Sequence, residues 1–98
     1  MENFELYQRA IKNWGITAQM DMMIEECSEL IGAIEKFRRG RVGVEEVVTE
    51  IADVEIMAEQ MRLVFGFDYV VEEKARKLQR LQERLDAWEK KNDCAEGV

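Results

Sequence analysis

Proline and histidine are absent from the 98 residues of this chain, and only two cysteines and six glycines are present. Without proline to break helices, and with little glycine to turn the chain, long uninterrupted helices are favoured. Without histidine, imidazole general bases, serine–histidine triads and the usual zinc sites are excluded. Any chemistry must therefore use carboxylates, a bound metal ion and the side chains of lysine and arginine.

Composition also narrows the possible partners. The net charge of −7 argues against a general nucleic-acid binder, although a metal ion can still hold a nucleotide phosphate against acidic side chains. The chain shows no basic-then-apolar leader and no apolar run of membrane-spanning length. Cys27 and Cys94 are predicted to be unpaired, as in a reducing compartment. These features predict a cytoplasmic protein without a membrane partner.

Apolar residues recur at helical spacing in four segments, which predicts an all-α chain. The expected helices run over Asn3–Asn13, Thr17–Arg39, Val44–Phe65 and Asp68–Lys90, with Thr17 and Asp68 as N-caps. The third helix is apolar on almost all sides and is expected to be buried all round. The four helices are therefore expected to form a bundle completed by association into a homodimer or tetramer. Residues 1–92 are predicted to form one domain and residues 93–98 a flexible tail.

Two acidic motifs lie within the second and third helices, Glu25-Glu26-Cys27-Ser28-Glu29 and Glu50-Ile51-Ala52-Asp53. Carboxylates three or four residues apart share one face of a helix. If the two helices form an antiparallel hairpin, the motifs lie at similar heights, since each is about ten residues from the turn on helices of constant rise. Clustered carboxylates need a cation between them, and oxygen ligands favour Mg²⁺. The residues alone leave a second interpretation open, in which both motifs are solvated acidic surfaces.

The sequence Glu26-x-x-Glu29 followed by Glu50-x-x-Asp53 resembles the ExxE…ExxD signature of the MazG-like, all-α nucleoside triphosphate pyrophosphohydrolases. The flanking Trp14-Gly15, Gln19 and Lys77-Leu78-Gln79-Arg80-Leu81 are similar as well. The resemblance implies a MazG-like bundle and an enzyme that hydrolyses an NTP or dNTP to the monophosphate and pyrophosphate, in housecleaning or pool control.

The same resemblance implies roles for individual residues. It implies that Glu26, Glu29, Glu50 and Asp53 bind Mg²⁺ and that a glutamate acts as the base. Glu25 either fills that role or supports the metal from outside the ligand set, and the sequence leaves both possibilities open.

Contacts to the substrate are predicted from the basic and aromatic residues. Lys77 and Arg80 match the basic helix of the family best and are expected to contact phosphate, with Lys74 as a further candidate. A solvated basic face is the alternative, above all for Lys74. Trp14 could stack on a base, although packing in the core is the favoured interpretation. Gln19 is expected either to bond a base edge or sugar, or to lie on the surface.

Two other functions remain open at this point. A narrow apolar stripe at near-heptad spacing in the fourth helix is typical of a seam between helices, which favours a non-catalytic interaction or regulatory module; its members are Val71, Ala75, Leu78, Leu81, Leu85 and Trp88. A related helical enzyme could instead act on another phosphorylated substrate, such as phosphoribosyl-ATP. Only part of the family's later Lys/Asn/Arg pattern is present, with Gln79 at one of its positions, so base and sugar selection is not predicted.

Overall fold

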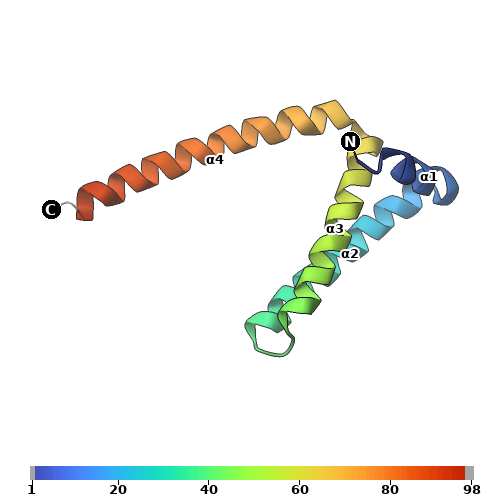
Figure 1. Cartoon of the computed structure of the whole chain (residues 1–98), viewed down its shortest axis with the longest axis horizontal. Coiled ribbons are helices and arrows are strands. Elements are labelled where there is room, and N and C mark those ends of the chain that lie inside the picture. The colour runs from blue at the N-terminus through green and yellow to red at the C-terminus, as the bar shows by residue number, and fades with distance from the viewer. Residues whose placement is uncertain (1, 97–98) are drawn as a thin grey trace. The chain divides into compact units, whose positions relative to one another are not determined.

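The computed structural model describes the backbone of residues 2–96 and the side chains of residues 2–93, and over that range it contains four helices and no strand. The helices are α1 (Phe4–Trp14), α2 (Ile16–Arg38), α3 (Val44–Phe65) and α4 (Phe67–Glu96) (Figure 1). The chain divides into two compact units, Met1–Gly66 with α1 to α3 and Phe67–Val98 with α4. The all-α prediction is confirmed, and the MazG-like bundle and its association stay predictions.

Helices α2 and α3 form an antiparallel hairpin, as Figure 1 shows. The turn begins with a Schellman motif, in which Gly40 N–H donates to the Phe37 carbonyl (3.0 Å) and Arg41 N–H to the Lys36 carbonyl (2.9 Å). Gly40 has φ +71°, a left-handed conformation that other residues adopt only with strain. This short, fixed turn brings the two acidic motifs onto facing arms of one hairpin.

The core of the first unit lies where α1 and α3 meet α2. Among the described residues, the buried apolar side chains are Tyr7 from α1, Ala33 from α2 and Met57 from α3. Gln19 and Gln60 are also buried. The pKa of the Tyr7 hydroxyl is raised, mainly by a hydrogen bond to Glu59 and to a smaller extent by burial. This hydrogen bond links α1 to α3. Three apolar residues are a small core, so the unit leaves much of its apolar surface uncovered.

The chain by itself does not bury the third helix all round, and burial of this helix by association with further copies stays a prediction. Within the first unit only α1 and α2 contact α3, so one side of this helix is covered. Val44, Val48, Ile51 and Ile56 are each at least 40% exposed on the other sides. Apolar residues on all sides of a helix thus show which faces it can bury. The number of neighbouring helices determines which of these faces are buried.

Several helix ends also differ from the prediction. Thr17 does not cap α2, which begins at Ile16 directly after Gly15 and has no side-chain cap. Asp68 lies in the first turn of α4, which begins one residue earlier, at Phe67. The bounds Val44–Phe65 of α3 are confirmed. Helix α4 continues past Lys90 to Glu96, so the residues of the predicted tail up to 96 are helical, and 97–98 lie outside the described residues.

Over the part of the chain described, no helix is both long enough and apolar enough to cross a membrane.

Candidate metal centre

One glutamate from each acidic motif, Glu26 on α2 and Glu50 on α3, lies at the seam between the two helices. On α2, Glu26 lies seven residues after the buried Gln19 and seven before the buried Ala33, so the three share one face. On α3, Glu50 lies seven residues before the buried Met57. Because both faces are turned towards the partner helix, Glu26 and Glu50 are half-buried instead of lying on the surface.

Three of the predicted metal ligands come together at this seam. One carboxylate oxygen from each of Glu26, Glu29 and Glu50 lies within 4.8 Å of the others. Glu29 is exposed, so the cluster is open to solvent on one side. Opposite ligands of Mg²⁺ are about 4.2 Å apart and those of the larger Ca²⁺ about 5 Å. The three oxygens are therefore close enough for one divalent cation to lie between them.

Two of these carboxylates carry oxygens that lack a protein partner. Glu26 Oε2 and Glu50 Oε2 are both buried and accept no hydrogen bond from the described residues. A buried polar atom without a partner destabilises the folded state, and a buried charged atom does so more strongly. A cation between α2 and α3 would satisfy both atoms, which is an independent indication of a metal site.

The electrostatics of the cluster point in the same direction. The pKa of Glu26 is raised to about 7, mainly by burial and then by the negative charges of Glu29 and Asp53. Burial, followed by the charge of Glu29, also raises the pKa of Glu50. All of these causes disfavour the ionised carboxylates in the metal-free protein, and a bound cation would favour the ionised form instead.

The other two predicted carboxylates lie at the edge of the cluster. Asp53 is half-buried one turn after Glu50, and its charge contributes to the raised pKa of both Glu26 and Glu50. Glu25 is exposed and, one residue before Glu26, points about 100° away around the helix. The structure thus gathers Glu26, Glu29 and Glu50, places Asp53 beside them, and leaves Glu25 on the outer side.

Gln19 lies inside the unit. Its Nε2 donates to Gln60 Oε1 at 2.6 Å, and Gln60 Nε2 in turn contacts Met57 Sδ at 3.7 Å. The surface position considered for Gln19 is therefore wrong, and its amide is engaged within the chain. Gln60 is a residue that the sequence reasoning missed, although its helical spacing from Asp53 and Met57 places it on the inner face of α3.

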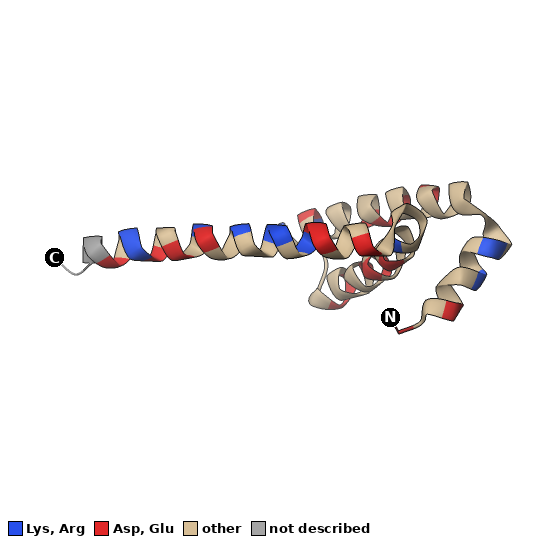
Figure 2. Cartoon of the chain, turned by 90° about the horizontal axis from the view of Figure 1, so that it is seen from above, with Lys and Arg blue, Asp and Glu red and all other residues tan. Residues whose placement is uncertain are grey.

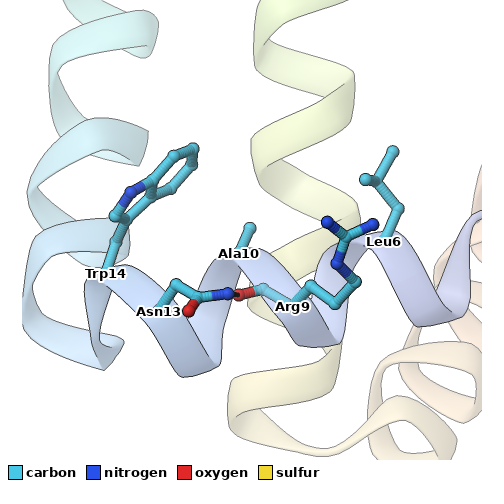
Figure 3. A pocket seen from close by; sticks show the side chains of 5 residues that line it. All are labelled: Leu6, Arg9, Ala10, Asn13 and Trp14. Carbon is cyan, nitrogen blue, oxygen red and sulfur yellow. Dashed lines mark hydrogen bonds between the residues drawn. The ribbon is translucent and has the colours of Figure 1, made fainter.

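Trp14 is 70% exposed, so the favoured interpretation of a core residue is wrong within this unit. Its indole lines an open pocket of about 410 Å³ on α1, together with Leu6, Arg9, Ala10 and Asn13 (Figure 3). Asn13 Nδ2 donates to the Arg9 carbonyl at 2.7 Å. Trp14 precedes α2, and Glu26 lies ten residues into that helix, about 15 Å along its axis. The pocket is thus separate from the acidic cluster.

The predicted phosphate contacts belong to the second unit. Lys74, Lys77 and Arg80 are all exposed on α4. Glu73 forms ion pairs with Arg76 and, at 3.9 Å, with Lys77. Figure 2 shows acidic residues on both α2 and α3, and acidic and basic residues interspersed along α4. The role of the three basic residues at a phosphate stays a prediction.

Comparison with models of protein families, with curated proteins and with solved structures gives no significant match to this chain. Membership of the MazG-like family therefore stays a prediction that rests on the motifs alone.

Proposed function

We propose that this chain is a Mg²⁺-dependent hydrolase that converts a nucleoside triphosphate to the monophosphate and pyrophosphate. The observation that supports the proposal most directly is the carboxylate cluster of Glu26, Glu29 and Glu50, with two buried oxygens that have no protein partner. Asp53, beside this cluster, is proposed as the fourth ligand. Such a donor set consists of oxygens alone, the type that Mg²⁺ prefers.

The residues of the site divide the work of hydrolysis between them. Bound Mg²⁺ would neutralise phosphate charge and lower the pKa of a coordinated water. Glu26 and Glu50, half-buried in the seam, would hold the cation, and the exposed Glu29 would complete the ligand set on the solvent side. Glu25 either accepts the proton of the attacking water or orients the ligands from outside. Lys77 and Arg80 are proposed to contact the phosphates.

Association of the chain with further copies is part of the proposal. The first unit has only three buried apolar side chains among its described residues, while Ile24, Ile31 and Val48 are each more than half exposed. A homodimer or tetramer would cover these side chains and enlarge the core.

Product analysis tests the activity. Purified protein is incubated with a panel of NTPs, dNTPs and phosphoribosyl-ATP, with and without Mg²⁺, and the products are followed by phosphorus NMR. We expect Mg²⁺-dependent release of monophosphate and pyrophosphate that Glu50→Gln abolishes. Glu55→Gln, which removes an exposed carboxylate from the same helix, is the matched control and is expected to keep full activity. Melting curves establish that each variant is folded.

A specific observation favours one other function. The apolar stripe of α4 is exposed, with Leu78 at 54%, Leu81 at 52% and Trp88 at 63%, as in a helix that binds another protein. In a non-catalytic interaction module, no nucleotide would be hydrolysed by the folded, Mg²⁺-loaded protein. Glu50→Gln would then leave binding intact and raise stability, because it removes repulsion from the cluster.

A further inference from the structure

Helix α4 presents a regular apolar seam that the proposed chemistry does not use. Counting Val71 as position a of a heptad repeat places Leu78, Leu85 and Asn92 at the following a positions. The d positions are then Lys74, Leu81 and Trp88, so the first d position is occupied by a charged residue. The continuous apolar part runs from Leu78 to Trp88, and each of its four members is at least 47% exposed.

The two edges of this seam differ in charge. The g positions on one edge are Lys77, Arg84 and Lys91, which are all basic and exposed. The e positions on the other edge are Ala75, Gln82 and Glu89, which are neutral or acidic. Charges at these flanking positions set the partner and the orientation of a coiled coil.

The charge pattern selects one orientation. In a parallel pair, each g residue lies beside the e residue five positions later on the partner. Arg84 then meets Glu89 of the second copy, and Lys77 meets the neutral Gln82. In an antiparallel pair g faces g, so that Lys77, Arg84 and Lys91 would lie against one another and repel. Complementary charge is therefore obtained only when two copies run in the same direction.

Asn92 adds a second indication. It occupies an a position of the seam, is half-buried, and its Nδ2 donates to the Trp88 carbonyl at 2.8 Å. A single asparagine at an a position is a known means of fixing the register and the number of strands, since a partner asparagine can satisfy it only in one alignment.

We propose that α4 pairs with α4 of a second copy of this chain as a parallel, in-register, two-stranded coiled coil. The seam residues Leu78, Leu81, Leu85 and Trp88 form its core, and Arg84 pairs with Glu89 across it. The proposal does not depend on the hydrolase activity. It also specifies an interface on the second unit, separate from the apolar surface of the α2–α3 hairpin.

The acidic α2–α3 hairpin is a different possible occupant of the seam. It carries acidic residues on both helices and would attract the basic g edge of α4. The opposite edge, with Glu89, would then lie against like charge. A second copy of α4 pairs Arg84 of one edge with Glu89 of the other and leaves no like charges facing each other along these edges, which is why we favour it.

Disulfide trapping in the full chain tests the arrangement. Cys27 and Cys94 are replaced by alanine, and Leu81→Cys is introduced at a d position, where the two copies face each other across the axis. We expect oxidised glutathione to convert this variant to a covalent dimer. Gln79→Cys, on the outer face of the same helix, is the control and is expected to remain monomeric on a denaturing gel. Absence of the Leu81→Cys dimer in a folded protein would contradict the proposal.

Spin-label distances provide a measurement that leaves the seam intact. Labels are attached in separate variants at Gln79, Asp86 and Asp93, three b positions on the outer face of α4. A parallel, in-register pair gives the same distance between copies at all three positions. Distances that differ along the helix would indicate an antiparallel pair, and the absence of any measurable distance between copies would show that α4 does not pair with a second α4. Either result overturns the proposal.

Charge reversal tests the pairing of Arg84 with Glu89. Either Arg84→Glu or Glu89→Arg turns two symmetric attractions into repulsions and should raise the dimer dissociation constant about tenfold. The double variant restores opposite charges and should return to the value of the unmodified chain. If the double variant is as weak as the single ones, Arg84 and Glu89 do not face each other.

Discussion

Within the acidic cluster, Glu26 is the residue whose ionised side chain most destabilises the folded protein when no metal is bound. It is half-buried, one of its oxygens has no hydrogen-bond partner, and three other carboxylates contribute to its raised pKa. Such a residue is a poor choice for stability alone, because a neutral side chain of similar shape would avoid the charge repulsion. The proposed metal site would explain the choice of glutamate at this position, because a bound cation requires its charge.

The first prediction concerns the pH dependence of stability without metal. The pKa of Glu26 is about 7 in the folded state, against an ordinary value of 4.5. Below pH 4.5 the carboxyl is protonated in both the folded and the unfolded state, and its full contribution to stability is present. As pH rises through about 7, that contribution is lost. We therefore expect the Tm in EDTA to fall between pH 5 and 8 more steeply in the unmodified chain than in Glu26→Gln.

The control for this measurement is Glu25→Gln, which alters the adjacent exposed carboxylate and should keep the pH dependence of the unmodified chain. Added Mg²⁺ should restore the Tm of the unmodified chain at pH 8, because a ligand that binds only the folded state stabilises it. Parallel pH curves for the unmodified chain and Glu26→Gln would contradict this account of Glu26.

The second prediction concerns the buried amide pair of Gln19 and Gln60. Gln19→Leu leaves the Gln60 oxygen buried without its donor and should lower the free energy of unfolding by about 1–3 kcal/mol. The double variant Gln19→Leu/Gln60→Leu removes both polar groups and should recover part of this loss. Urea denaturation measures both effects, and Gln79→Ala, at an exposed position, should change stability by less than about 0.5 kcal/mol. Additive losses in the double variant would show that the two amides are not coupled.

At the scale of single elements, the turn of the α2–α3 hairpin sets the alignment of the two acidic motifs. Gly40 is held at φ +71° by the Schellman motif, whereas Gly43, at the other end of the turn, has φ −90°. The two glycines thus have different conformational requirements, although the sequence shows them as equivalent neighbours of Arg41 and Val42.

The third prediction compares these two glycines. Gly40→Ala should lower the free energy of unfolding by about 1–2 kcal/mol, because a Cβ is strained in the left-handed region. Gly43→Ser should cost nothing or stabilise, since serine is a favoured N-cap and its Cβ meets only the mobile end of Glu45, at 2.9 Å. Chemical denaturation of both variants checks the difference. Equal losses would mean that the turn does not depend on the left-handed Gly40.

Much of this element-level organisation could be predicted from the sequence. Apolar spacing identified four helices, and the Arg38–Gly43 segment separated the two arms that bring Glu26 and Glu50 together. The prediction of helix ends failed where the same residues were compatible with two different starting points of a helix. Thr17 has the chemistry of an N-cap, but the chain turns at Gly15 and leaves no place for it.

The positions of Trp14 and Gln19 show a second limit. Burial of a single residue depends on which helices pack beside it, and a sequence read alone does not determine the number of these neighbours. Trp14 is exposed at an open pocket although it is large and apolar, and Gln19 is buried although it is polar, because Gln60 on α3 supplies its hydrogen bond.

At the scale of the whole molecule, the described part of the chain buries too few apolar side chains for a domain of this length. The fourth prediction follows from the proposed association. Folding coupled to assembly makes the Tm rise with protein concentration. Ile31→Glu places a charge at a position that is 60% exposed in the single chain, so it should cost little unless that position is buried between copies.

We therefore expect Ile31→Glu to abolish the concentration dependence of the Tm and to lower the mass measured by light scattering. Thr17→Glu adds the same charge at an exposed polar position of α2 and should leave both properties unchanged. A monomeric mass and a constant Tm for the unmodified chain across a hundredfold range of concentration would contradict association through this surface.

The confinement of all four proposed ligands to one hairpin has a further consequence. Glu26 and Asp53 are the outermost members, so the whole set lies within one continuous stretch closed by a single turn. Contacts that are close along the chain form rapidly and with little loss of entropy. A designer could therefore move all four carboxylates to another helical scaffold as one segment. The α2–α3 hairpin is thus a self-contained segment for grafting the proposed divalent-cation site into a designed protein.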